Sequence, residues 1–121
     1  MTSLADLLGA ISQAVRGCHT AFAMDYDGLP LEAIWPGAGG PPDLVDAIGA
    51  EFAAVLREAR QAAQDLGLGP LQSVSVRAQG PSLVFRCGQD SLLVAVVDRT
   101  ASTAVARRAL AEAGRHELPA L

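Results

Sequence analysis

The chain has 121 residues, of which 50% are hydrophobic and 18% are charged. This length suits one compact domain that buries roughly two-thirds of the surface of its unfolded form. The apolar content excludes a disordered linker. The formal net charge is −4, and every basic residue is arginine. An acidic chain without lysine is poorly suited to phosphate backbones or anionic membranes, so neither nucleic-acid binding nor membrane insertion is expected.

The N-terminus predicts a protein that stays in the cytoplasm. Residues 1–6 contain no basic residue, unlike the start of a signal peptide. The longest apolar run, Leu92 to Val97, has six residues, far fewer than the ~18 of a membrane span. We therefore expect Cys18 and Cys87 to be reduced thiols.

The first third of the chain predicts a helix followed by a hairpin. Apolar residues at helical spacing indicate a helix over residues 3–16 with Ser3 as its N-cap. The period then changes to two, which indicates a strand over residues 20–25. Asp27-Gly28 is a hairpin-turn signal. Residues 31–35 supply the return strand.

A second, longer helix is predicted from a cap at Asp43 to Leu66, because Gly67 and Gly69 stop the pattern. Its large apolar residues fall within an arc of roughly 120°. This arc predicts a wall that faces the core, formed by Leu44, Val45, Ile48, Phe52, Val55, Leu56 and Leu66.

The last part of the chain predicts three strands and a helix. The strands cover residues 71–78, 83–85 and 92–97, and the last has no polar face, so it should be central. A final helix over residues 102–113 ends at Gly114 and leaves residues 114–121 as a tail. The expected order is α-β-β-α-β-β-β-α in one domain spanning residues 1–121. Short hairpin links require a five-stranded antiparallel sheet flanked by helices, which is an α+β fold.

The sequence carries no motif for catalysis, for a metal or for a cofactor. It has no P-loop and no lysine to complete one, no dinucleotide fingerprint and no GxSxG elbow. Asp25-Tyr26-Asp27-Gly28 lacks the further ligands of a calcium loop and fits a hairpin turn better. Cys18 and His19 are neighbours on a strand and point to opposite faces. Arg99 lies in a loop, where an arginine finger could insert, but a solvated surface charge is the simpler interpretation.

Two features favour a homodimer. Ala47, Ala50 and Ala54 lie at helical spacing, and small residues let a second backbone approach closely. The alternative is that alanine is simply the best helix former. A strand over residues 71–78 at a sheet edge would add a surface that can pair with another chain.

The residues taken together resemble the roadblock/dynein light chain family, and within it the bacterial MglB-like branch. The resemblance covers about residues 3–113 and rests on the order and spacing of four pieces. They are the hairpin Ala23-Met24-Asp25-Tyr26-Asp27-Gly28-Leu29-Pro30-Leu31, the long helix from Asp43 to Leu66 with Gly67-Leu68-Gly69, the strand Leu71-Gln72-Ser73-Val74-Ser75-Val76, and Leu92 to Ser102. The chain departs from the family at Thr103, where members often have glycine.

The resemblance implies a homodimer in which the long helices lie side by side and the third strands join into one ten-stranded sheet. This implies an interface of Ala47, Ala50, Ala54, Val74 and Val76. It also implies a Ras-like small GTPase as partner, bound through the paired long helices and stimulated without an inserted arginine. We expect the charged side of the long helix to face that partner, through Asp46, Glu51, Arg57, Glu58, Gln61 and Asp65.

Two other functions remain open. Some family members are scaffolds, so the chain could be a nucleotide-independent adaptor in a motor or signalling complex. A small-ligand sensor of similar topology is the weaker alternative, because the aromatic content of 4% is low for a roomy ligand pocket.

Overall fold

The computed structural model describes residues 3–37, 41 and 43–115. Its elements follow the predicted order α-β-β-α-β-β-β-α. They are α1 (Leu4–Ala14), β1 (Cys18–Asp25), β2 (Pro30–Ile34), α2 (Leu44–Asp65), β3 (Ser73–Val76), β4 (Ser82–Cys87), β5 (Ser91–Val97) and α3 (Thr103–Arg115).

The five strands form one antiparallel sheet in the order β2-β1-β5-β4-β3. β5 is central, as predicted, and all seven of its residues are buried. A strand that is buried on both faces of the sheet needs no polar side, which explains the continuous apolar run. β2 and β3 are the edge strands, so each has one row of backbone groups outside the ladder.

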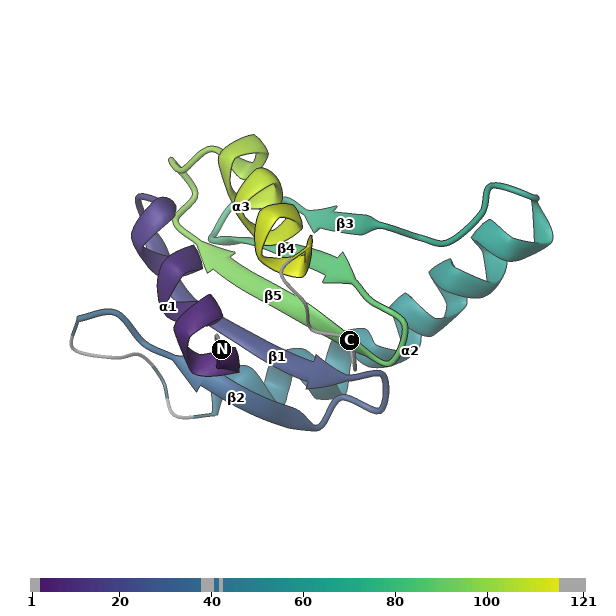
Figure 1. The fold of residues 1–121 in the computed structure, drawn as a ribbon, viewed down its shortest axis with the longest axis horizontal. Coiled ribbons are helices and arrows are strands. Elements are labelled where there is room, and N and C mark those ends of the chain that lie inside the picture. Colours follow the sequence, from purple (N-terminus) through teal and green to yellow (C-terminus); the bar gives the residue numbers. More distant parts are fainter. Residues whose placement is uncertain (1–2, 38–40, 42, 116–121) are drawn as a thin grey trace.

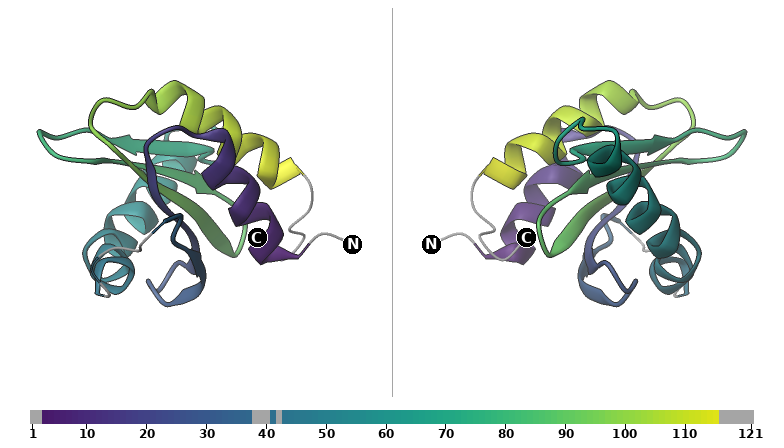
Figure 2. Two further views of the ribbon diagram at one scale, coloured as in Figure 1. Left: turned by 90° about the vertical axis from the view of Figure 1, so that its left-hand side faces the viewer. Right: turned by 90° about the vertical axis from the view of Figure 1, so that its right-hand side faces the viewer.

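The helices cover the two faces of the sheet unequally. α1 and α3 lie on one face, whereas α2 lies alone on the other and extends beyond the sheet at its C-terminal end (Figure 1, Figure 2). Alternating β1 residues serve both layers: Ala21 and Ala23 face α1 and α3, and Phe22 and Met24 face α2. The α2 layer therefore has one helix where the opposite layer has two.

The N-termini of the three helices are capped to different degrees. Ser3 and Asp6 form a complete capping box at the start of α1. Ser102 accepts a hydrogen bond of 3.2 Å from the backbone N–H of Val105 at the start of α3. Asp43 occupies the N-cap of α2, but its side chain makes no capping hydrogen bond.

Two predicted boundaries are corrected. The strand predicted over residues 71–78 is only four residues long. α3 continues through Gly114 to Arg115, because an isolated glycine is tolerated inside a helix that packs well. The rest of the predicted tail, residues 116–121, lies outside the described residues.

A contact between two glycines fixes α2 against the β1–β2 hairpin. Gly28, in the hairpin turn, has φ +86°, a conformation that other residues rarely adopt. A Cβ added at Gly49 would lie 2.9 Å from the carbonyl carbon of Gly28 and 3.1 Å from its Cα. The two backbones therefore touch, and neither position has room for a side chain.

The buried side of α2 is turned in part from the predicted core-facing wall. Its buried residues include the small Gly49, Ala53 and Ala63 beside Leu56. The prediction that Val55 and Leu66 face the core is wrong. Val55 is 50% exposed and Leu66 is 73% exposed. The rest of the predicted wall does face the core: three of its residues are buried and two are half-buried, namely Val45, Ile48, Leu56, Leu44 and Phe52.

Candidate functional site

The predicted interface residues of α2 all lie at the surface. Ala47, Ala50 and Ala54 are exposed, and so are the six residues predicted to face a partner: Asp46, Glu51, Arg57, Glu58, Gln61 and Asp65. Val74 and Val76 on β3 are half-buried and pack against the core on the α2 side of the sheet.

The helical period divides the exposed surface of α2 into two flanks. One flank combines acidic and apolar residues, with Glu51, Val55 and Glu58 at spacings of four and three. The other flank is polar and carries Arg57, Arg60, Gln61 and Gln64. The residues predicted to face a partner lie on both flanks, with Glu51 and Glu58 on the first and Arg57 and Gln61 on the second.

The first flank borders an open part of the sheet. Phe52, one turn before Val55, packs against Phe85 of β4 with ring centroids 5.6 Å apart. Beyond this pair, α2 leaves several apolar residues of the sheet half-buried. Phe52, Val74, Val76 and Leu83 are half-buried and pack against the core between α2 and the sheet, and Val55 of α2 is 50% exposed. We call these five residues together the open α2 face.

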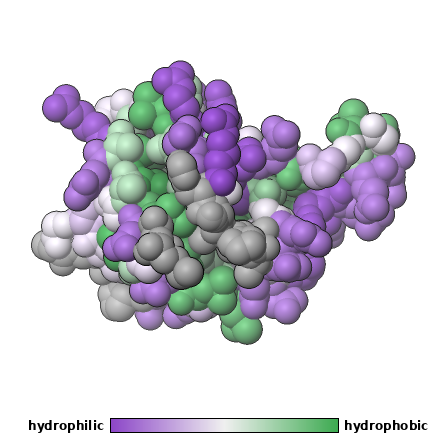
Figure 3. Space-filling model, viewed as in Figure 1, coloured by the Kyte–Doolittle hydropathy of each residue, from purple (hydrophilic) through white to green (hydrophobic). Residues whose placement is uncertain are grey.

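Further apolar residues are exposed at the ends of the molecule. Leu66 and Leu68, where α2 ends and the loop to β3 begins, are each 73% exposed. Hydrophobic side chains accordingly gather at the far end of α2, on the right of Figure 3. Leu29 and Leu31, at the β1–β2 hairpin, are 62% and 51% exposed.

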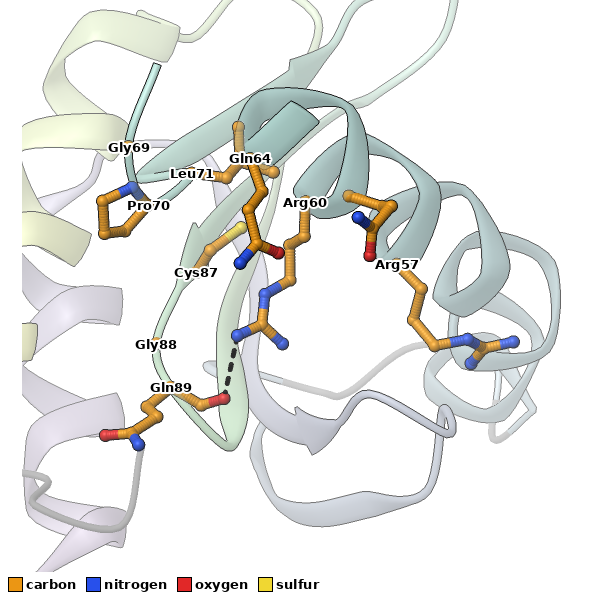
Figure 4. Close-up of a pocket in the computed structure, with 10 residues that line it drawn as sticks. Arg57, Arg60, Gln64, Gly69, Pro70, Leu71, Cys87, Gly88 and Gln89 are labelled. Atoms are coloured by element: carbon orange, nitrogen blue, oxygen red, sulfur yellow. Dashed lines mark hydrogen bonds between the residues drawn. The ribbon is translucent and has the colours of Figure 1, made fainter. Parts of the chain in front are cut away.

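The second flank of α2 borders a pocket of about 680 Å³ (Figure 4). α2 supplies four polar side chains, and the walls opposite come from the α2–β3 loop and from the end of β4 with its turn into β5. The lining residues are Arg57, Arg60, Gln61, Gln64, Gly69, Pro70, Leu71, Cys87, Gly88 and Gln89.

Tyr26 holds the two arginines of this flank. The guanidinium of Arg57 donates to the Tyr26 carbonyl oxygen. The guanidinium of Arg60 lies 4.0 Å from the centroid of the Tyr26 ring and donates to the carbonyl oxygen of Gln89 at 3.1 Å. A cation over an aromatic face is attracted by the ring quadrupole. The pocket wall is thus tied to the β1–β2 hairpin.

The buried end of Tyr26 is also fixed. Its hydroxyl donates to the carbonyl oxygen of Gly88 at 2.6 Å. Burial, reinforced by the neighbouring Cys87, raises the pKa of Tyr26 to about 12. Burial also raises the pKa of the Cys87 thiol. Both groups are therefore neutral at physiological pH, which suits a structural role for each.

A second polar cluster follows the end of β5. The carboxylate of Asp98 accepts hydrogen bonds from the backbone N–H and the hydroxyl of Thr100, and these bonds lower the pKa of Asp98. His19 Nε2 lies 3.7 Å from this carboxylate. Arg99, considered above as an arginine finger, is exposed in the same loop. Among the described residues, no group of three or more His, Cys, Asp or Glu is arranged to hold a metal ion.

Sequence reasoning missed the pocket. Neither Arg60 nor Gln64 was among the predicted site residues. A signal was present: Arg57, Arg60, Gln61 and Gln64 follow helical spacing and form a stripe without a carboxylate.

No protein-family model and no curated protein matches this sequence. Solved structures do match it. A roadblock/LC7 domain from Streptomyces avermitilis superposes with a TM-score of 0.80, covering 98% of this chain and 97% of that chain at 23% identity. The chain has the roadblock/LC7 fold. The fold that the resemblance implied is therefore confirmed.

Two further matching structures are MglB proteins. The gliding protein MglB from Thermus thermophilus matches with a TM-score of 0.73 and 21% identity, covering 93% of this chain and 89% of that chain. Myxococcus xanthus MglB matches with a TM-score of 0.74 and 14% identity, covering 93% and 92%. Within the described part of this roadblock-fold chain, no helix has both the length and the apolar character needed to cross a bilayer.

Proposed function

We propose that this chain is a homodimeric regulatory module that binds a Ras-like small GTPase and modulates its GTP hydrolysis. The observation that carries the proposal is the open α2 face beside the free edge of β3. A second copy of the chain fits both features at once. The fold similarity to MglB structures supports the resemblance to the MglB-like branch, and that resemblance implies a small GTPase as the partner.

The open α2 face favours a second copy for an energetic reason. Val55 is half exposed, and covering the remaining surface of a valine contributes on the order of 1 kcal/mol. A two-fold axis places each contact twice in the interface, so the contribution doubles. Ala47, Ala50 and Ala54 have short side chains, so two α2 helices can approach closely along them.

The edge strand supports the same arrangement. In the described residues β3 pairs with β4 alone, so its other side offers unpaired N–H and C=O groups. Antiparallel pairing of β3 with its copy would extend the sheet to ten strands. Val74 and Val76 would then be covered from outside by the second α2.

The GTPase would meet the exposed charges of the paired helices, namely Asp46, Glu51, Arg57, Glu58, Gln61 and Asp65. In this proposal the module adds no catalytic group of its own. It favours one conformation of the GTPase by binding that conformation more tightly, and a shift in population requires only this difference in affinity. The rate of hydrolysis would change through the GTPase's own residues.

Solution mass tests the dimer. The mass per chain is 12.4 kDa, and we expect a species of twice that mass by light scattering. Val55→Glu places a charge in the interface and should give the monomer. Val105→Glu is the matched control, because Val105 is 41% exposed on α3, in the opposite layer. A monomeric wild type, or equal dissociation by both variants, contradicts the proposed dimer.

Capture from the source cytosol tests the partner. Immobilised wild type is incubated with extract containing GDP or a non-hydrolysable GTP analogue, and retained proteins are identified by mass spectrometry. We expect a small GTPase that is retained only with the analogue. Replacing Arg57 and Gln61 together by alanine should weaken retention and leave the dimer intact. Retention of another subunit, equal in both nucleotides, would instead support the adaptor function.

A further inference from the structure

The pocket beside α2 differs in charge from the rest of the chain. The protein carries a net charge of −4, yet the pocket lining contains two arginines and three glutamines and no aspartate or glutamate. Fixed positive charge in a concave site concentrates anions there. The charge of the lining therefore favours an acidic ligand.

Arg60 is held in place before any ligand arrives. The Tyr26 ring and the Gln89 carbonyl oxygen fix its guanidinium from two directions. A guanidinium has five N–H donors in a planar fork that matches a carboxylate, and the bond to Gln89 uses only one of them. Ordering this side chain in the free protein reduces the entropy lost on binding.

The amide of Gln64 lies beside Arg60. In Figure 4 both side chains reach from α2 toward the strand that carries Cys87 and Gly88. Gln64 is exposed, and its amide N–H₂ adds two neutral donors next to the guanidinium. The two residues together present a cationic fork and an amide to one carboxylate.

Part of the opposite wall is apolar. Pro70 and Leu71 come from the α2–β3 loop, and the side chain of Cys87 lies between Leu71 and Gln64 (Figure 4). A volume of about 680 Å³ lies within the range of sites that hold compact ligands. The site thus combines a place for a carboxylate with a place for a neighbouring apolar side chain.

We infer that this pocket docks a short acidic segment of a protein partner, with a carboxylate on Arg60 and Gln64 and an apolar side chain against Pro70 and Leu71. A protein segment is favoured over a free metabolite because the pocket is continuous with the exposed flank of α2 that carries Arg57 and Gln61. The inference rests on the proposed function in one respect: the segment belongs to the partner that binds this flank.

The probe is an acetylated, amidated tripeptide of glutamate between two leucines, titrated into the ¹⁵N-labelled protein. About 10 mM peptide saturates even a site with a Kd of ~1 mM. We expect saturable shifts in the backbone signals of Gly69, Gly88 and Gln89 and in the side-chain amide of Gln64. The same peptide with glutamine in place of glutamate should shift these signals at least fivefold less.

Two variants identify the site. Gln64→Glu should weaken binding at least fivefold, because it places a negative charge beside Arg60. Gln13→Glu is the matched control, since Gln13 is an exposed glutamine near the end of α1, and it should leave the affinity within twofold. Arg60→Gln should abolish the shifts. Gln64→Glu does not remove the contacts of Arg60 with Tyr26, so it tests the site even if the Arg60 variant does not fold.

Four results would overturn the inference. They are no shifts at the highest peptide concentration, equal shifts with both peptides, equal effects of Gln64→Glu and Gln13→Glu, or shifts that centre on the arginines of α3. The titration contains no GTPase. Peptide binding without nucleotide-dependent capture of a GTPase would therefore count against the proposed function alone. Nucleotide-dependent capture without peptide binding would count against the pocket alone.

Discussion

The contact between Gly49 and Gly28 allows the sharpest test of the packing. We expect Gly49→Ala to destabilise the protein by roughly 2 kcal/mol. Alanine stabilises a helix interior by about 1 kcal/mol relative to glycine. The added Cβ, however, would lie 2.9 Å from the Gly28 carbonyl carbon. This is well inside the ~3.5–4.0 Å optimum for carbon atoms.

The obstacle is backbone, which cannot rotate away as a side chain can. Overpacking in a core costs about 1–3 kcal/mol, occasionally more, and separating the hairpin from α2 places this case at or above the top of that range. The clash therefore exceeds the gain in helix propensity. The expected sign is destabilising, although the substitution is favourable by propensity alone.

Gly9→Ala is the matched control. Gly9 lies inside α1, and a Cβ built there meets nothing within 4 Å. This variant should stabilise the protein by about 1 kcal/mol. Urea unfolding followed by circular dichroism measures both variants. If Gly49→Ala is as stable as Gly9→Ala, the hairpin does not touch α2 as described, and the account of this packing fails.

Two predictions concern pH. Tyr26 is the only tyrosine, so its ultraviolet titration is unambiguous; it should ionise near pH 12 in the folded protein and near the ordinary value of about 10 in urea. Because the pKa of Tyr26 is raised in the folded protein, its contribution to stability is complete below the unfolded pKa and is lost as the pH rises through the folded pKa. Tyr26→Phe should therefore remove this loss of stability at alkaline pH. A transition near pH 10 in the folded protein would refute the burial argument. The pH dependence of stability that comes from Asp98 runs in the opposite direction. Its contribution is present above the unfolded pKa of 3.8 and is lost as the pH falls through the lower pKa of the folded protein. Urea unfolding of Asp98→Asn across the acid range should lack this part of the pH dependence, and an unchanged acid dependence would show that the bonds from Thr100 do not favour the ionised form.

Local patterns predicted most of the fold. Ser3 signalled the start of α1, Asp27-Gly28 signalled the hairpin, and the unbroken apolar run of β5 signalled its central position. Each of these features acts between near neighbours in the chain or reports burial on both faces. They are therefore visible without knowledge of tertiary contacts.

The orientation of α2 could not be predicted in the same way. A helical wheel collects large apolar residues into one wall, and it does not distinguish a residue covered by its own chain from one that awaits a second chain. Val55 is one of the apolar residues that its own chain leaves exposed. The sequence around Gly49 does not indicate that the backbone of Gly28, 21 positions earlier, lies against it. The exposure of Val55 is itself the feature that the proposed dimer explains.

The candidate sites were predictable only in part. The sequence identified exposed residues of α2, but it could not show which element of the fold lies beside each flank. The pocket depends on Gly88 and Gln89, which are separated from α2 by β3 and β4 in the chain. Such a site exists only once the sheet is assembled.

The central claim is that two copies of this chain act together on one small GTPase in a nucleotide-dependent way. Isothermal titration calorimetry with the captured GTPase, purified and loaded with either nucleotide, tests both halves in one experiment. The account predicts two copies of the chain per GTPase with the non-hydrolysable GTP analogue and at least tenfold weaker binding with GDP. One copy per GTPase, or equal affinity for the two nucleotide states, would contradict it.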